Sequence, residues 1–278
     1  DIAGHTLPIQ MGVRAIAVDR PLPADLSLTI LGPVEQTGLI SEIDGTATAW
    51  MIDQRSNASI STIESLLAAQ VPVYRLRSAV GTYDAGTIVV PDAPGRDEAI
   101  EDAVAESGAT AIAINLAGDI PAWRQRSVRL GVYKPWTSSM DEGWARWVLE
   151  SYNQPYTSLS TPDVRQGGLR AQFDAILIPE MSVRDLVEGH LEKDTRYSDD
   201  PYPAEYVGGL GEVGLAALRE FVAEGGTLVA IDAVSEAIID AFALPVRRPL
   251  ASVKSDEFYC PGSLLKVVVD NDDPLGFG

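Results

Sequence analysis

The sequence predicts an α/β protein of two modules, the second a flavodoxin-like, doubly wound parallel sheet. The first observation is that short apolar runs alternate with longer segments typical of helices. Strands that alternate with helices in this way indicate parallel βαβ units. The second observation is a linker-like stretch, residues 115–126 with Gly118 and Pro121, after which the alternation starts again. We therefore divide the chain into modules at residues 1–126 and 127–278.

The first module is expected to hold strands and helices in turn. Strands are expected at residues 13–18, 26–31, 47–52, 71–74, 87–90 and 110–114, and helices at 57–69 and 96–107. Ser56 or Asn57 can cap the first helix, because a side-chain oxygen there accepts an unpaired N–H group of the first turn. Residues 53–57 as a whole form a strand-to-helix junction, which either binds a ligand or caps the helix. Capping is the favoured interpretation.

The second module repeats this alternation. Strands are expected at residues 128–133, 175–178, 227–231 and 264–269, and helices at 140–152, 212–223 and 234–242. Residues 185–200 are polar and charged, and we expect them to form an exposed loop. Because each strand is separated from the next by a helix or a long connection, a parallel sheet is the expected arrangement.

Composition and charge exclude several classes of protein. The chain has 278 residues, of which 46% are hydrophobic, and a formal net charge of −19. This acidity argues against nucleic acid and anionic membrane surfaces as partners, since both attract basic patches. No apolar run approaches the ~20 residues that span a bilayer, so we expect a soluble protein without a membrane partner. The single cysteine, Cys260, rules out an internal disulfide framework.

Several stretches, in the same order along most of the chain, carry a resemblance to a known family. They are residues 5–12 (HTLPIQMG), 52–57 (IDQRSN), 132–136 (VYKPW), 140–144 (MDEGW), 165–168 (RQGG), 206–209 (YVGG), 225–229 (GGTLV) and 258–262 (FYCPG). Together they resemble the region that follows the peptidase domain in bacterial zinc carboxypeptidase-family proteins of the carboxypeptidase A type. The resemblance implies that the second module is a class I glutamine-amidotransferase-like domain. It also implies that such chains continue beyond Gly278 with a further strand.

The peptidase chemistry of that family is not expected within this chain. A carboxypeptidase of this type holds zinc through a His-x-x-Glu pair and a later His, which leaves one position open for water. The chain has only His5 and His190, and neither begins a His-x-x-Glu motif. We therefore expect no metal site and no cofactor here, and zinc only in a peptidase domain upstream of Asp1. The absence of an initiator Met before Asp1 agrees with a chain processed or cut from something longer.

The amidotransferase reaction is not expected either. It needs a thiolate on a tight strand-to-helix turn, and the corresponding turn here holds Asp232 and Ala233. We interpret this as a degenerate nucleophile turn, in which the Asp232 carboxylate caps the following helix. Cys260 lies outside the turn and has no neighbouring His in the sequence, so it is interpreted as an incidental or buried thiol.

A ligand crevice is expected after the first strand of the second module, at the carboxyl end, where open α/β sheets bind ligands. Its candidate residues are Lys134, Trp136, Asp141, Glu142, Gly208 and Gly209. Aromatic walls with a few charges suit a small molecule or a peptide end. The competing interpretation places Trp144 and Trp147 on a core-facing stripe, with Asp141 and Glu142 complementing the helix N-terminus. The latter is favoured for these four residues, and Lys134 and Trp136 are left open.

Two functions of different classes follow. The first is a non-catalytic accessory region of a zinc metallocarboxypeptidase-like protein, which packs against the peptidase domain, forms an oligomer with itself or presents substrate. The second is an independent hydrolase or small-ligand-binding protein that uses the crevice. A weaker third is a protein whose acidic face recruits a basic partner. For localisation, the resemblance implies an exported bacterial protein.

Overall fold

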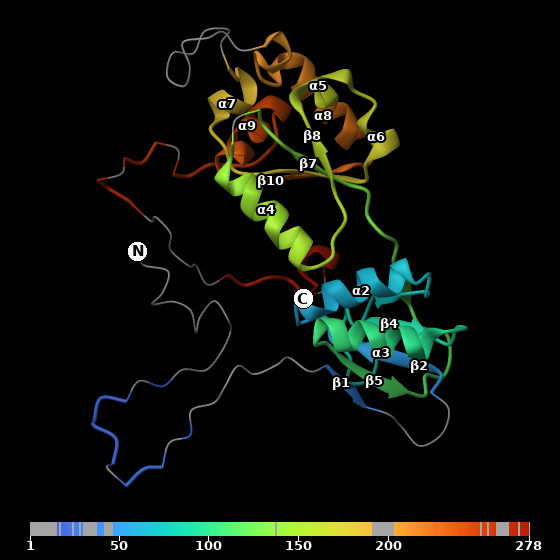
Figure 1. Cartoon of the computed structure of the whole chain (residues 1–278). Helices are drawn as coiled ribbons and strands as arrows, with labels where there is room; N and C mark the ends of the chain where they lie inside the picture. The colour runs from blue at the N-terminus through green and yellow to red at the C-terminus, as the bar shows by residue number, and fades with distance from the viewer. Residues whose placement is uncertain are drawn as a thin grey trace.

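The chain folds around two separate β-sheets, each with its own helices (Figure 1). The computed structural model describes residues 38–41, 47–136, 138–190 and 203–250, with shorter stretches within 16–29 and 252–277. The two sheets have separate hydrophobic cores. The mixed α/β class predicted from the sequence is therefore confirmed. Within the described residues, no helix has the length and apolar character needed to cross a bilayer.

The first sheet has six strands in the order β1-β5-β2-β4-β3-β6. The strands are β1 (Leu39–Ser41), β2 (Ala49–Ile52), β3 (Tyr74–Leu76), β4 (Ile88–Pro91), β5 (Thr110–Ile114) and β6 (Ala122–Arg124). Only the β1–β5 pair is parallel, and the other four neighbouring pairs are antiparallel. The predicted parallel βαβ arrangement of this half is therefore wrong.

The reason lies in two helical crossovers that each skip a strand. Helix α2 (Ala58–Ala68) joins β2 to β3, and β4 lies between these two strands. Helix α3 (Arg96–Ser107) joins β4 to β5, and β2 lies between them. The joined strands run parallel, as a helical crossover requires, yet every hydrogen-bonded neighbour within this group is antiparallel. This interlocked β-α-β-β-α-β arrangement is that of ferredoxin-like folds.

Helices α2 and α3 cover one face of this sheet. Their buried residues, among them Leu66, Ile100 and Val104, pack on alternate side chains of the strands such as Ile52 and Ile88. A second, smaller cluster with Met51 and Val89 fills the opposite face under the loops. Because consecutive strand residues point to opposite faces, strands such as β2, buried at all four positions, read as continuous apolar runs.

In the first half, some predicted boundaries of helices and strands are confirmed, and others differ from those in the structure. Helix α3 and strand β5 have the bounds expected from the sequence, and β2, β4 and α2 lie within a residue or two of them. The strand expected at 71–74 is instead β3, which begins at Tyr74, and the linker-like stretch contains β6. The extended segments expected at 13–18 and 26–31 fall mostly outside the described residues.

The second sheet is parallel throughout and has the order β10-β9-β7-β8. Its strands are β7 (Leu130–Tyr133), β8 (Thr157–Leu159), β9 (Ala175–Ile178) and β10 (Thr227–Ala230). Its helices are α4 (Met140–Ser151), α5 (Thr161–Gln166), α6 (Leu169–Gln172), α7 (Val183–Val187), α8 (Gly211–Ala223) and α9 (Ala233–Phe242). The module boundary that we predict after residue 126 falls between β6 and β7 and stays a prediction.

Two expectations for this half need correction. The polar stretch expected as a loop from residue 185 begins inside α7, whose Leu186 is fully buried in the core. Residues 191–200 of that stretch lie outside the described part of the chain. The strand expected at 264–269 is absent from its described residues, 267–269, which have irregular backbone and exposed valines.

The two faces of the second sheet are covered unequally. Helices α5 to α9 lie on one side, and α4 lies alone on the other (Figure 1). On the side of α5 to α9, Ile176, Ile178, Leu218 and Phe221 form a closed core. The other side opens progressively along one row of paired strand residues: Val132 is fully buried, Leu177 is half-buried, and Val229 is 45% exposed. Only the β7 end of this face is therefore covered by α4.

Trp144 and Trp147 of α4 do not lie in a core. Each side chain is 59% exposed, and their rings meet edge-on at 5.7 Å between centroids. Met140 and Val148 on the same helical stripe are exposed as well. The interpretation of this stripe as core-facing is therefore wrong, because no described segment covers the half of the sheet beside α4.

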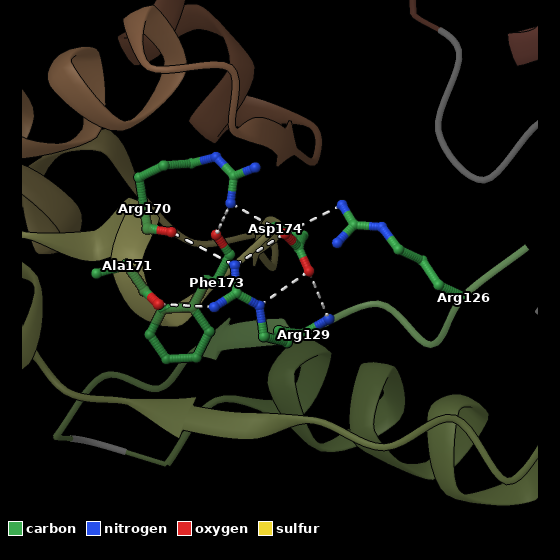
Figure 2. A network of polar contacts seen from close by, with 6 residues as sticks. All are labelled: Arg126, Arg129, Arg170, Ala171, Phe173 and Asp174. Atoms are coloured by element: carbon green, nitrogen blue, oxygen red, sulfur yellow. Dashed lines mark hydrogen bonds and ion pairs between the residues drawn. The ribbon is translucent and has the colours of Figure 1, made fainter. Parts of the chain in front are cut away.

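The amino-terminal edge of the second sheet is fixed by a carboxylate among three arginines (Figure 2). Asp174, which immediately precedes β9, has a side chain only 9% exposed and forms ion pairs with Arg126, Arg129 and Arg170. Arg129 donates to both carboxylate oxygens, at 3.0 and 2.9 Å, and also to the Ala171 carbonyl. These hydrogen bonds, those from Arg129 first, hold the pKa of Asp174 well below its usual range.

The backbone of Asp174 extends this arrangement to the neighbouring strands. Its N–H donates to the Arg129 carbonyl at 2.8 Å, and its carbonyl accepts from the Thr227 N–H at 3.0 Å. Asp174 thereby joins the beginnings of β7, β9 and β10. Polar side chains also connect the two halves of the chain: Asn57 donates to the Tyr152 hydroxyl and Asn153 donates to the Glu106 carboxylate.

The first prediction concerns the closed core of the second sheet. Replacing Leu218, which is fully buried in α8, by Ala should lower the free energy of unfolding by about 2–5 kcal/mol, because it leaves a cavity. Val213→Ala is the matched control, since Val213 lies on the exposed side of the same helix and should cost at most ~0.5 kcal/mol. Urea unfolding measures both. Equal costs would contradict the described orientation of α8.

The second prediction concerns Asp174. The lowered pKa means that ionised Asp174 stabilises the folded state above the pKa of an unfolded aspartate, about 4, and that this contribution is lost as the pH falls toward the folded pKa. Asp174→Asn should therefore unfold at lower urea concentration than the native chain at pH 7. As the pH falls below ~4, the difference between the two urea midpoints should shrink progressively. A difference that does not depend on pH would contradict the role of the charge.

Candidate functional site

A cavity of about 410 Å³ opens at the carboxyl ends of β7 and β8. Parallel α/β sheets bind ligands at this edge, and the volume falls within the ~300–1,000 Å³ usual for small-molecule sites. Its walls come from the loops that follow β7 and β8, from α7 and from the segment before α8. The lining residues are Tyr133, Lys134, Pro135, Trp136, Ser158, Ser160, Thr161, Pro162, Asp163, Asp185, Gly189, His190, Tyr206 and Gly208.

Lys134 and Trp136, expected from the sequence to face a crevice, both line this cavity. The Trp136 ring stacks on Tyr206, with 3.3 Å between ring centroids and 13° between the planes. Lys134 is exposed, and its side chain forms no hydrogen bond or ion pair with any residue that the structure describes. The cavity therefore combines a flat aromatic wall with a free cation.

Hydroxyl groups also line the cavity. The Tyr133 hydroxyl lies 2.8 Å from the Thr161 hydroxyl, and burial raises the pKa of this tyrosine, so it is neutral at physiological pH. Ser160 caps α5 and exchanges hydrogen bonds with Asp163 in a capping box. In the same way, Ser182 caps α7 and donates to Asp185 at 2.7 Å. Both aspartates are thus held in place at the mouth of the cavity.

The glycine pair predicted for the crevice is divided between two roles. Gly208 lines the cavity and has a positive φ of 84°, which a side chain would strain. Gly209 does not line it: a Cβ atom there would come within 2.6 Å of the Leu186 carbonyl oxygen, so this glycine allows close packing on α7. The backbone at His190 pairs with this segment, and Gly208 N–H donates to the His190 carbonyl at 2.7 Å.

Asp141 and Glu142 do not line the cavity, although the sequence placed them in the same crevice. Both lie in the first turn of α4, where negative charge favours the helix N-terminus. Glu142 is buried, and its Oε1 atom lies 2.9 Å from Nε of Arg146 one turn later. These two carboxylates therefore stabilise α4, as the competing interpretation expected.

The turn at Asp232 has an unusual backbone. Asp232 lies between β10 and α9 with φ 49° and ψ −123°, a combination that a residue with a side chain rarely adopts. Sharp turns of this kind between a strand and a helix present nucleophiles in hydrolases. Ala233 begins α9, and the following Val234 is fully buried, which holds the turn against the core.

The carboxylate of Asp232 does not cap α9, so that part of the sequence interpretation is wrong. No side-chain cap hydrogen bond is formed there, and the Asp232 backbone carbonyl accepts from the N–H and hydroxyl of Ser235 instead. The Asp232 carboxylate is left available at the carboxyl edge of the sheet.

The carboxylate of Glu180 lies near this turn as well. Glu180 follows β9, and its pKa is raised by burial and then by the negative charges of Asp141 and Asp232. The carboxyl edge is therefore acidic beside β9 and β10. In the described part of the chain, no group of three or more His, Cys, Asp or Glu side chains is arranged to hold a metal ion.

The other sequence candidates lie apart from the cavity. In the junction before α2, Asp53 accepts three hydrogen bonds from the Arg55 side chain and one from its N–H, and the hydrogen bonds from the Arg55 side chain are the largest cause of its lowered pKa. Asn57 occupies the N-cap position without a cap hydrogen bond, and the Ser56 hydroxyl accepts from the Ala58 N–H. Cys260 and His5 lie outside the described residues.

Sequence reasoning missed most of the cavity wall. Ser158, Ser160 and Thr161 follow β8, a strand of three residues that is too short to be recognised from its pattern. Glu180, near the Asp232 turn, was missed too, although its position two residues after the end of β9 could have identified it. Tyr206 carried no such signal, because it reaches Trp136 only through the folded chain.

Comparison with protein-family models, with curated proteins and with solved structures finds no match for this chain. The geometry of the cavity and of the Asp232 turn therefore carries the functional argument.

The third prediction tests the strain at Asp232. Sparsely populated backbone conformations cost of order 1–3 kcal/mol, and glycine removes that cost at an entropic penalty of about 0.5–1 kcal/mol. Asp232→Gly should therefore raise the free energy of unfolding by about 1 kcal/mol. Ala241→Gly in the last turn of α9 is the control and should lower it by at most about 1 kcal/mol. A destabilised Asp232→Gly chain in urea unfolding would show that the turn is unstrained.

Proposed function

We propose that this chain is a non-catalytic accessory region of a zinc metallocarboxypeptidase-like protein, which binds its peptidase domain or a second copy of itself. The observation that carries the proposal is the uncovered apolar side of the second sheet. It comprises Met140, Trp144, Trp147 and Val148 of α4 with Val229 of β10, and we call it the α4 face. Exposed aromatic residues of this kind are enriched at protein–protein contacts.

The sheet itself supports an interaction role for the α4 face. Parallel sheets are normally covered by helices on both sides, because their strands are apolar on both faces. Here the row from Val132 to Val229 becomes steadily more exposed away from α4. A layer that covers Leu177 and Val229 would complete the sheet, and its absence from the described residues favours a partner surface.

The strand order supports the flavodoxin-like part of the proposal. In chain order, the strands of the second sheet lie as second, first, third and fourth. Flavodoxin-like sheets have the order 2-1-3-4-5, so the four strands agree with the first four positions of that arrangement. The resemblance of the quoted sequence stretches to the amidotransferase-like region of zinc carboxypeptidase-family proteins supplies the family context.

The Asp232 turn supports the non-catalytic part. Its backbone has the sharp strand-to-helix geometry that presents a nucleophile, but a carboxylate there is not a substitute for the thiolate of glutamine hydrolysis. The carboxylates near it, Glu180 and Asp141, are also unsuited to activate a thiol as a histidine would. We infer a degenerate amidotransferase-like domain that keeps the turn and has lost the reaction.

A second candidate function is the binding of a small molecule in the cavity beside β7 and β8. The specific observation that favours it is that Lys134 and Trp136 line a cavity of about 410 Å³ and that both side chains are exposed. This function does not exclude the first, because the cavity and the α4 face are formed by different residues.

The fourth prediction tests the accessory function. Sedimentation velocity of the purified chain, alone and mixed with the peptidase domain of its parent protein, should reveal one complex. The double variant Trp144→Ser/Trp147→Ser should weaken that complex by at least about tenfold, because two aromatic contacts are lost. Trp123→Ser is the control, since Trp123 is partly exposed on β6 of the other sheet.

Two results would contradict the proposal. One is the absence of any complex both in the chain alone and in the mixture, or a complex that the double variant forms with unchanged affinity. The other is catalysis by the chain alone, measured as ammonia released from glutamine or as C-terminal residues released from a peptide panel with added zinc. Elemental analysis of the same preparation shows whether any zinc is bound in stoichiometric amount.

A further inference from the structure

We propose that the cavity at the carboxyl ends of β7 and β8 binds a free α-amino acid with an apolar or aromatic side chain. This inference rests on the second candidate function above and names its ligand class. It does not involve the Asp232 turn, which is not part of the cavity lining.

The size of the cavity limits the ligand. About 410 Å³ lies at the lower end of the range for small-molecule sites, so a single amino acid fits and a dinucleotide does not. The walls come from four separate stretches of the second half of the chain, and no residue of the first sheet contributes. All of its described lining residues therefore come from the second half of the chain.

The charges of the cavity select a zwitterion. Among the described lining residues, Lys134 contributes an ammonium group and Asp163 and Asp185 contribute carboxylates, and the His190 imidazole lines the cavity as well. A phosphate or another multiply charged anion would be repelled by the two aspartates, and a simple cation would leave Lys134 without a counter-charge. A ligand that carries one carboxylate and one ammonium group satisfies both signs.

The two aspartates have lone pairs available for an ammonium group. In each, the described hydrogen bonds reach Oδ2 alone: Ser160 donates to Asp163 Oδ2, and Ser182 donates to Asp185 Oδ2. Oδ1 of each residue accepts no hydrogen bond from any described residue. Because the serines hold the carboxylates in fixed orientations, little side-chain entropy is lost when a ligand binds.

The aromatic wall of the cavity suits the apolar or aromatic side chain of the proposed amino acid. Trp136 and Tyr206 stack on one another and present apolar surface to the cavity, together with Pro135 and Pro162. An apolar or aromatic side chain would pack there and remove this surface from water. The neutral hydroxyl pair of Tyr133 and Thr161 lies on the cavity lining and offers hydrogen bonds without adding charge.

The fifth prediction uses L-phenylalanine as the probe, in isothermal titration calorimetry with the whole chain. L-Phenylalanine should bind, and phenethylamine and 3-phenylpropionate should bind at least about tenfold more weakly, because each lacks one of the two charges. Lys134→Met should weaken phenylalanine at least about tenfold and should not weaken phenethylamine, which has no carboxylate for the lysine to bind. Lys254→Met is the matched control and should change neither, because Lys254 is exposed and does not line the cavity.

The outcomes separate this inference from the function on which it rests. Equal affinity for the three phenyl compounds, or an unchanged affinity for phenylalanine in Lys134→Met, would show that the cavity does not recognise a zwitterion. The second candidate function, binding of a small molecule, would still stand. Tighter binding of inorganic phosphate than of phenylalanine would overturn the proposed ligand class as well. If no compound of the panel gives either a heat of binding or a fluorescence change that Trp136→Ala, folded as judged by circular dichroism, abolishes, both the ligand class and the second candidate function fail.

Discussion

The second half of the chain depends on the carboxylate of Asp174. It lies where three strands begin, and three arginines from the linker, from the start of β7 and from α6 meet there (Figure 2). In a parallel sheet a shift of one residue would move every side chain to the opposite face. The Asp174 cluster fixes the alignment of β7, β9 and β10 at the amino-terminal edge, and thereby brings their carboxyl ends level at the other edge. The cavity and the Asp232 turn both lie at that second edge.

The same sheet shows how a strained turn and an open face coexist. The turn at Asp232 is held by β10 on one side and by the buried residues of α9, including Val234 and Ile238, on the other. Packing on the closed face therefore supports the unusual backbone, in the way that surroundings sustain strain at functional sites. The opposite face contributes nothing to this, since Val229 lies there exposed. The closed face of the sheet therefore stabilises the fold, and the opposite face carries the proposed interaction surface.

The sequence predicted the elements better than their arrangement. Helix α3 has the expected bounds because glycines with left-handed backbone lie at both of its ends, and β9 was recognised as a short apolar run. The antiparallel pairing of the first sheet was not predicted, because alternation of strands and helices indicates a crossover without showing whether another strand lies between. Trp144 and Trp147 followed a core-facing spacing, but spacing does not show whether anything covers the stripe.

In the candidate site, the residues that could be predicted from the sequence are those that come soon after a strand. Lys134, Trp136 and Asp232 were found in this way, since the carboxyl end of a parallel strand is a recognisable place. Tyr206, Asp163 and Asp185 reach the cavity through tertiary structure alone. The backbone of Asp232 was not predicted either, because the residue type gives no indication of its positive φ.

The interlocked crossovers of the first sheet have a consequence for the synthesis of the chain. Strand β2 is central, yet both of its hydrogen-bonded neighbours, β4 and β5, come later in the sequence. A nascent chain that has emerged only as far as α2 presents an apolar strand with both edges unpaired, and pairing is complete only when residue 114 is available. Unpaired apolar strands associate readily with other chains. The first half of this protein is therefore most exposed to misassembly on the ribosome, before its last strand has been made.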